Sequence, residues 1–161
     1  MRKLSKEKNP GPPPLRTDAA LPQPGEKGTY LLVLFLDGEI VLEAGSRKEE
    51  RFPAGCYAYI GSAQGGLLPR LGRHLRSEKK LRWHIDYLLR HARIVEIRWH
   101  VGPERLECTW ARAIGQSSAP RPLFRGFGSS DCRCPSHLFY LGKRLPRKEW
   151  IRTGPVCVAS G

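Results

Sequence analysis

A strand followed by a helix is predicted by two segments, GCYAYIGSA at residues 55–63 and LPRLGRHLR at residues 68–76. In the first segment two tyrosines alternate with smaller residues, as on a half-buried strand whose successive side chains face opposite sides. We expect Gly61 to end this strand, and the Gly65–Gly66 pair to turn the chain. Pro69 suits a first helical turn, where its missing N–H costs nothing. Tyrosine hydroxyls are therefore expected where a strand leads into a helix.

The helix predicted at residues 68–76 carries cations beside that strand end. Its expected apolar stripe, at helical spacing, consists of Leu68, Leu71 and Leu75. Arg70 falls outside the stripe, and His74 follows it by one turn. Hydroxyls beside a cationic helix are suited to handling a phosphate group.

Several short motifs resemble the GIY-YIG nuclease superfamily. YIG at residues 59–61, followed by Arg70 and His74 in an R-x-x-x-H helix, resembles the second half of the signature. GTY at residues 28–30 is similar to the first half, with Thr29 where the family name has isoleucine. Three longer motifs lie at residues 57–63, 83–87 and 127–132. They resemble the branch of small stand-alone GIY-YIG-like proteins, whose members are sometimes fused to DNA-repair glycosylases. The resemblance covers about residues 26–142.

The resemblance implies a divalent-metal-dependent endonuclease that hydrolyses DNA phosphodiester bonds in repair or processing. It also implies that Glu107, on a helix, binds one Mg²⁺ or Mn²⁺ ion. By itself, a glutamate early in a helix would be interpreted as complementing the helix dipole. Because the central region has few acidic residues, a carboxylate-rich two-metal site is not expected.

The other catalytic roles fall on two tyrosines, an arginine and a histidine. Arg70 would contact the scissile phosphate, because a planar guanidinium donates two parallel hydrogen bonds to phosphate oxygens. The resemblance favours Tyr30 as the general base and Tyr59 as a group that orients water or phosphate; the residues alone do not distinguish them. A phenol with a pKa near 10 needs nearby cations to act as a base, and both tyrosines also fit the rim of a core. His74 fits a core-edge histidine and a phosphate or water contact equally well.

The charge balance favours a polyanionic partner. Twenty-eight Lys+Arg against 15 Asp+Glu give a formal net charge of +13 over 161 residues. DNA is the expected partner, RNA is not excluded, and a DNA-repair protein is a further candidate. The cations expected to contact nucleic acid are Arg73, Arg76, Lys79, Lys80 and Arg82. No apolar run approaches the ~20 residues of a membrane helix, and no secretory signal is evident, so no membrane association and a cytoplasmic location with reduced cysteines are expected.

The chain is expected to hold one α+β domain, with a small, partly antiparallel sheet and about three helices. Residues 1–25 are rich in Lys, Arg and Pro, and this composition predicts a flexible basic arm. We expect the GIY-YIG-like domain to span residues 26–142 and a basic tail to span residues 143–161. The apolar run 30–36 predicts a strand buried on both faces.

Further elements follow along the chain. Asp37–Gly38 signals a tight hairpin that would return as a strand at residues 39–43, before a loop at 45–53. In the strand expected at 93–101, Val95 and Ile97 would share one face. The remaining expected elements are helices at 81–90 and 104–114, a loop at 116–125 and a strand at 137–141.

Cys132, Cys134 and His137 form a compact group of soft ligands, of the kind that binds zinc. However, C-x-C lacks the usual C-x₂₋₄-C spacing, and the fourth ligand would have to be the distant Cys108 or Cys157. We therefore expect zinc to be unlikely and interpret the cysteines as a buried thiol pair in a tight loop.

Two other function classes compete with the nuclease. A non-catalytic nucleic-acid-binding module on the same fold would explain the charge, because affinity for phosphate needs only cations. A zinc-stabilised protein-interaction domain is supported only by the Cys/His group. Tyr30, Tyr59, Arg70 and Glu107 together favour the enzyme, since binding alone requires no such set. Asp86 is expected to anchor basic neighbours rather than to serve as a second metal carboxylate.

Overall fold

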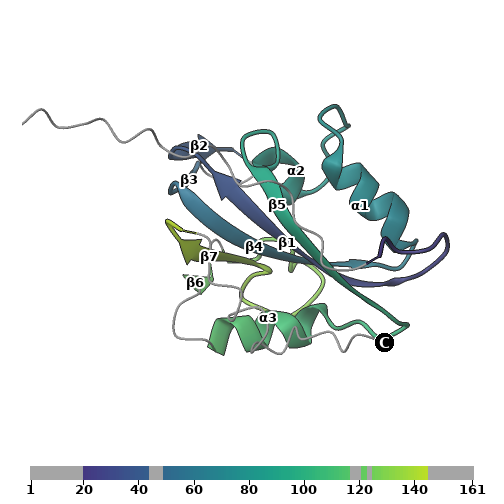
Figure 1. Cartoon of the computed structure of the whole chain (residues 1–161). Coiled ribbons are helices and arrows are strands. Elements are labelled where there is room, and N and C mark those ends of the chain that lie inside the picture. Colours follow the sequence, from purple (N-terminus) through teal and green to yellow (C-terminus); the bar gives the residue numbers. More distant parts are fainter. Residues whose placement is uncertain (1–19, 44–48, 117–120, 123–124, 145–161) are drawn as a thin grey trace, which may run out of the picture.

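The apolar segment Gly28–Leu36 forms β1, an inner strand of the main sheet (Figure 1). This computed structural model describes residues 20–43, 49–116, 121–122 and 125–144, so most of the expected basic arm and tail lies outside the described residues. β1 pairs antiparallel with β4 (Gly55–Ala63) on one side and β5 (Arg93–Val101) on the other. With a neighbour on each side and a covered surface on each face, β1 is almost wholly buried, as its continuous apolar run predicts.

β7 (Leu138–Gly142) pairs antiparallel with the other side of β4 and completes most of the sheet. The two-residue β6 (Arg121–Pro122), in the segment expected to be a loop, pairs with β7 and gives the strand order β5-β1-β4-β7-β6. The α+β class is confirmed, and the strand expected at residues 137–141 is found within one residue at each end. β4 continues through Gly61 to Ala63, so the prediction that Gly61 ends it was wrong.

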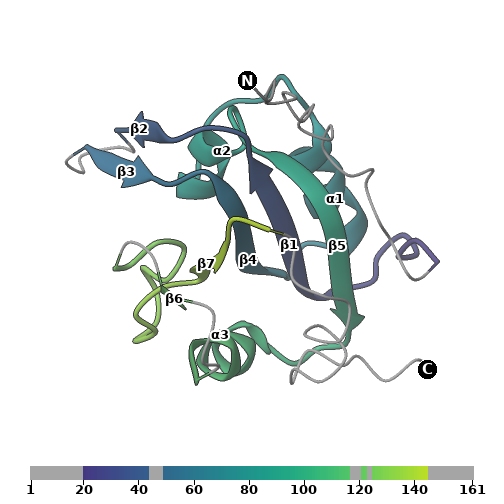
Figure 2. The ribbon, with the colours of Figure 1, turned by 60° about the vertical axis from the view of Figure 1, so that its left-hand side comes forward.

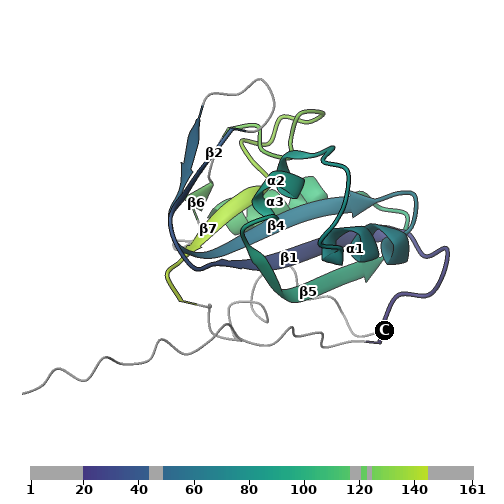
Figure 3. The same cartoon turned by 90° about the horizontal axis from the view of Figure 1, so that it is seen from above.

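Helices cover both faces of the sheet (Figures 1 and 3). On one face, alternate β1 side chains pack in a core with residues of α1 (Leu67–Leu75) and α2 (His84–Leu88). On the other face, the intervening β1 side chains pack against α3 (Glu107–Gln116), which contributes Trp110 and Ile114. This alternation follows from the period of two along a strand. α2 and α3 begin three residues later than expected, and α3 runs past Ile114 to Gln116.

The hairpin predicted at Asp37–Gly38 was wrong. β2 (Ile40–Leu42) pairs with β3 (Glu50–Phe52), within the segment expected to be a loop, and not with β1. Because β4 and β5 already occupy both edges of β1, no edge is left for a returning strand. Figure 2 shows the β2–β3 ribbon extending beyond the main sheet, and Phe52 anchors it in the core.

The inward face of α1 also differs from the prediction. Its buried residues are Leu67, Leu71 and His74. Leu68 and Leu75, expected inward, have 38% and 51% of their surface exposed. Both sets satisfy helical spacing, and the polar His74 lies inside with its Nε2 hydrogen-bonded to the Tyr30 hydroxyl, while its buried Nδ1 has no partner among the described residues.

β5 has the expected bounds but not the expected faces. Its register with β1 shifts between Val33 and Leu34, whose partners are Glu96 and Ile94. The extra residue between those partners, Val95, is a β-bulge and packs on the α3 side of the sheet. Ile97 packs on the opposite side, so its predicted sharing of a face with Val95 was wrong.

Candidate functional site

A cleft of about 610 Å³ lies beside the start of β1 and the end of β4. Tyr30, Tyr59, Arg70 and Glu107, which sequence reasoning singled out, all line it. His74 does not, because it is buried behind Tyr30. The other lining residues are Gly61, Ser62, Gln64, Arg82, Trp83, His84, Arg105, Gly128, Ser130 and Asp131.

The register between β1 and β4 brings the two tyrosine motifs together. Tyr30 lies opposite Gly61, and the ring centroids of Tyr30 and Tyr59 are 6.4 Å apart. A Cβ atom at Gly61 would overlap the phenol of Tyr30. Glycine at this position therefore makes the space that the Tyr30 ring occupies.

Tyr30 and His74 form a buried pair at the inner side of the cleft. The Tyr30 hydroxyl is 2.7 Å from Nε2 of His74, and both residues are almost completely buried. Burial raises the pKa of Tyr30 to about 12, although the Arg70 guanidinium acts in the opposite direction. Burial, reinforced by the charge of Lys79, lowers the pKa of His74 to about 4. Near neutral pH the phenol is therefore protonated and the imidazole neutral, so the hydroxyl can donate to Nε2.

The two arginines of α1 have different environments. Arg70 lines the cleft, and its guanidinium carbon lies 4.4 Å from the centroid of the Trp83 ring. Arg73 lies 4.1 Å from the same centroid but donates to both oxygens of Asp86, at 2.7 and 2.8 Å. Asp86 is fully buried and also accepts the backbone N–H of Arg82 and Trp83. It anchors basic neighbours, as expected.

The cations expected to contact nucleic acid divide into two groups. Arg73 is held by Asp86, and Lys79 donates to the carbonyl oxygens of Arg73 and His74 at the end of α1. These two stabilise the protein's own structure. Arg76, Lys80 and Arg82 are exposed, and of these Arg82 lines the cleft.

Glu107 begins α3, where it reaches the cleft from the far side of the sheet. The hydroxyl of buried Thr29 accepts the backbone N–H of Leu106 at 3.1 Å, which ties the start of α3 to β1. Burial raises the pKa of Glu107, and the nearby Asp131 carboxylate adds to this effect. Glu107 and Asp131 thus place two carboxylates in one cleft, and carboxylate oxygens are the kind of ligand that could hold a hard cation.

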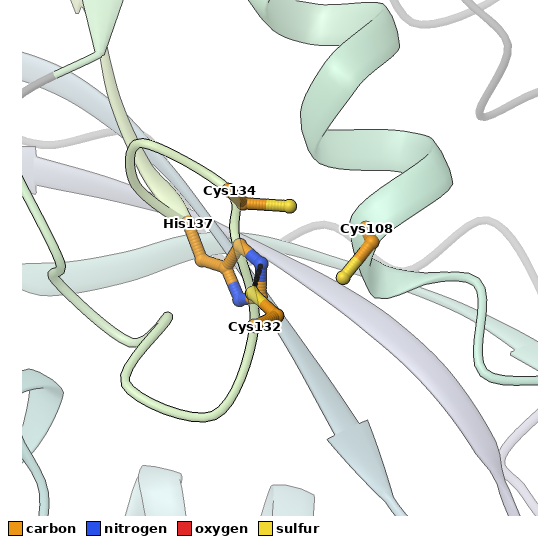
Figure 4. Close-up of side chains that lie close together, drawn as sticks. All are labelled: Cys108, Cys132, Cys134 and His137. Carbon is orange, nitrogen blue, oxygen red and sulfur yellow. Dashed lines mark hydrogen bonds between the residues drawn. The ribbon is translucent and has the colours of Figure 1, made fainter.

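A second group of side chains lies at the same helix start (Figure 4). Cys108 projects from α3 toward Cys132, Cys134 and His137 of the following loop. The ligand atoms of these four residues all lie within 4.8 Å of one another. Burial and the neighbouring thiols raise the pKa of Cys108 to about 12. Cys157, the other cysteine considered as a fourth ligand, lies outside the described residues.

Sequence reasoning did not identify two charged residues of the cleft. Asp131 was part of the motif at residues 127–132 but was given no role, and Arg105 had no distinguishing pattern. Only the fold brings the loop that carries Asp131 to Glu107, across a long stretch of chain. The motif was the signal that could have identified Asp131.

Comparisons with known proteins add one finding. A family model described as a domain of unknown function, DUF123, matches residues 29–154. Comparisons with curated proteins and with solved structures found no significant match. In the part of the chain that the structure describes, every helix is too short or too polar to cross a membrane.

Proposed function

The chain belongs to the DUF123 family of domains of unknown function, and we propose from its cleft that it is a divalent-metal-dependent endonuclease acting on DNA. The observation that carries this is the meeting of Tyr30, Arg70 and Glu107, from three different elements, in one cleft. Phosphodiester hydrolysis needs an acceptor for a proton of the attacking water, positive charge at the phosphate and help for the leaving oxygen. The cleft has a group suited to each need.

Glu107 and Asp131 would hold the metal ion. Mg²⁺ and Mn²⁺ are bound through oxygen, often by one or two carboxylates with waters completing the shell. The raised pKa of Glu107 fits this role, because a bound cation would offset the charge of Asp131 nearby. When bound, such an ion supplies positive charge at the phosphate oxygens and lowers the pKa of its water.

Arg70 would bind the scissile phosphate. Its planar guanidinium can donate two parallel hydrogen bonds to phosphate oxygens. Stacking over Trp83 restricts the guanidinium, so that its donors are ordered before substrate arrives. Arg82 and Arg105 would extend the cationic surface along the substrate.

The Tyr30–His74 pair would accept the proton of the attacking water. As the Tyr30 oxygen takes that proton, its own hydroxyl proton passes along the 2.7 Å hydrogen bond to Nε2 of His74. The step avoids a free phenolate, which a pKa of about 12 makes costly at neutral pH, at the smaller cost of protonating His74, whose pKa is about 4. His74 is then a positioning residue that acts through Tyr30. Tyr59, beside Tyr30, would orient water or phosphate.

A nucleic-acid-binding module without catalysis is the second candidate. The formal net charge of +13 and the exposed Arg76, Lys80 and Arg82 favour it, because binding to phosphates needs cations and no catalytic group. Three predictions accompany both candidate functions: RNA is not excluded as the nucleic acid, a DNA-repair protein is a candidate partner, and a reducing cytoplasm is the expected compartment.

A cleavage assay separates the two candidates. The full chain is incubated with single-stranded, duplex, flapped and nicked DNA and with RNA, in Mg²⁺, in Mn²⁺ and in chelator. We expect cleavage of DNA that requires the divalent ion. If no substrate is cut with any ion while binding persists, the nuclease proposal is wrong and the binding module replaces it.

Matched variants test the individual roles. Arg70→Ala should lower the rate by about 10²–10³, and Arg70→Lys should recover little of it. Arg76→Ala, at the end of the same helix and outside the cleft, is the control; it should weaken binding and leave the rate at saturation nearly unchanged. Glu107→Gln should abolish cleavage and retain DNA binding, and Tyr30→Phe should cost more rate than Tyr59→Phe.

A further inference from the structure

We propose that Cys108, Cys132, Cys134 and His137 bind a zinc ion, in a structural centre distinct from the hard-cation site of the cleft. This goes beyond the proposed function, because it concerns a different metal and does not depend on cleavage. Its ligand atoms come from two parts of the chain that are far apart in sequence, the first turn of α3 and the loop before β7.

The geometry of the four residues, taken together, fits a tetrahedral site. With Zn–S near 2.3 Å and Zn–N near 2.0 Å, a sulfur and a nitrogen ligand in a tetrahedron lie roughly 3.5 Å apart. The Sγ of Cys132 and the Nε2 of His137 are 3.5 Å apart. All other ligand pairs lie within 4.8 Å, so small side-chain movements would close the tetrahedron. Figure 4 shows Cys108 pointing from its helix toward this group.

The chemistry of the ligands selects the metal. Three thiolates and an imidazole are soft and borderline ligands, which favour zinc over Mg²⁺ or Mn²⁺. Four protein ligands leave no open position, as in structural rather than catalytic zinc sites. The expectation that zinc is unlikely rested on the C-x-C spacing and on the distance of Cys108 along the chain. In the fold, Cys108 lies beside the loop, and the short spacing only requires that the loop turn tightly.

The loop that supplies three of the ligands has little regular structure of its own. Between Gly126 and His137 it is held by turns and by a few backbone bonds, including Gly126 N–H to the Pro135 oxygen at 2.6 Å and His137 N–H to the Phe127 oxygen at 2.8 Å. The carbonyl of His137 accepts the N–H of Ile60 and so joins the loop to β4. A metal ion would add the link to α3.

The consequence is that the zinc would fix one wall of the cleft. Asp131 directly precedes the ligand Cys132, and Glu107 directly precedes the ligand Cys108. One ion between the two cysteines would therefore set the relative positions of two carboxylates that line the cleft. The zinc would take no part in chemistry and would act only on the position of those groups.

The test measures metal directly and does not use activity. The full chain, purified without chelator under reducing conditions, should contain one zinc per chain by elemental analysis. Replacement of zinc by Co²⁺ should give the visible absorption of tetrahedral cobalt together with thiolate-to-metal charge transfer. Cys108→Ser and Cys134→Ser should each lower the affinity for zinc. The loss should exceed the roughly 10–100-fold that follows from removing a residue that only hydrogen-bonds to a metal ligand. Cys157→Ser is the matched control and should keep its zinc.

Several results would overturn the site. These are a chain without stoichiometric zinc that also fails to bind added Zn²⁺, a disulfide among the three cysteines that persists under the reducing conditions of the purification, or an octahedral cobalt spectrum. If Cys157→Ser loses its zinc and Cys108→Ser keeps it, the fourth ligand is Cys157 and the assignment of Cys108 is wrong. If a serine variant does not fold, the cobalt spectrum of the parent chain decides. Glu107→Gln should keep its zinc even though it abolishes cleavage, so the two proposals fail separately.

Discussion

Replacing Gly61 by alanine tests how the two tyrosine motifs fit together. Gly61 lies in β4 and has no positive φ, so its backbone suits alanine as well as glycine. The effect of the substitution is therefore steric. The added Cβ would overlap the hydroxyl and ring of Tyr30, which lies opposite on β1.

The cost can be worked out from the contacts of Tyr30. Its ring is fully buried, and its hydroxyl is already 2.7 Å from Nε2 of His74, so the ring cannot move further toward that histidine. Overpacking of a core typically costs about 1–3 kcal/mol. Displacing the ring would also break the hydrogen bond to His74, for about 1 kcal/mol more. We expect Gly61→Ala to lower the free energy of unfolding by about 2–4 kcal/mol.

Urea unfolding of the full chain, followed by circular dichroism, measures this difference. Gly65→Ala is the control, because a Cβ there would meet nothing within 4 Å, and it should change the free energy by less than about 0.5 kcal/mol. In the Gly61→Ala background, Tyr30→Leu should recover part of the loss, since a shorter side chain leaves room for the methyl group. A Gly61→Ala chain as stable as the parent, or strictly additive costs in the double variant, would refute the packing of Tyr30 against Gly61.

Three further predictions concern charge. Because burial lowers the pKa of His74 to about 4, the unfolded chain binds a proton at this histidine at a higher pH than the folded chain does. As the pH falls from about 6.5 to 4, the histidine's contribution to the free energy of unfolding should therefore decrease by up to about 1.4 kcal/mol per pH unit. The difference between the parent chain and His74→Gln in urea titrations measures this decrease. Arg73→Ala strands the buried carboxylate of Asp86 and should cost about 3–5 kcal/mol in the same assay; a loss below about 1 kcal/mol would contradict the pairing. Arg82→Ala should reduce the slope of log affinity for duplex DNA against log salt by about 0.9, the value for one phosphate, and an unchanged slope would remove Arg82 from the interface.

Local patterns predicted the main strands well. The apolar run at 30–36, the tyrosine alternation after residue 55 and the alternation at 93–101 each predicted a strand that the structure contains, and the two tyrosines meet because β1 pairs with β4. Local patterns did not predict the buried face of α1, because two sets of residues have the same helical spacing. Leu68 and Leu75 fit a helical stripe as well as Leu67 does, and only the Tyr30 hydroxyl makes the inward His74 favourable.

The remaining errors concern partners that are distant along the chain. The turn signal at Asp37–Gly38 is local, whereas the occupation of both edges of β1 is a property of the whole sheet. The bulge at Val95 arises from pairing and leaves no mark in the alternation of β5. Likewise, no spacing rule connects Cys108 with Cys132, or Glu107 with Asp131, since each pair is joined only when α3 and the loop pack together.

The pairing of β1 has a consequence for the time course of synthesis. β1 leaves the ribosome first among the strands, yet Gly28 pairs with Val101, the last residue of β5. At about 5–20 residues per second, several seconds pass between the appearance of these two strands. During that interval one edge of a nearly continuous apolar segment has no native neighbour, and such an edge can associate with other chains. Because apolar association weakens on cooling, a lower expression temperature should raise the yield of folded protein.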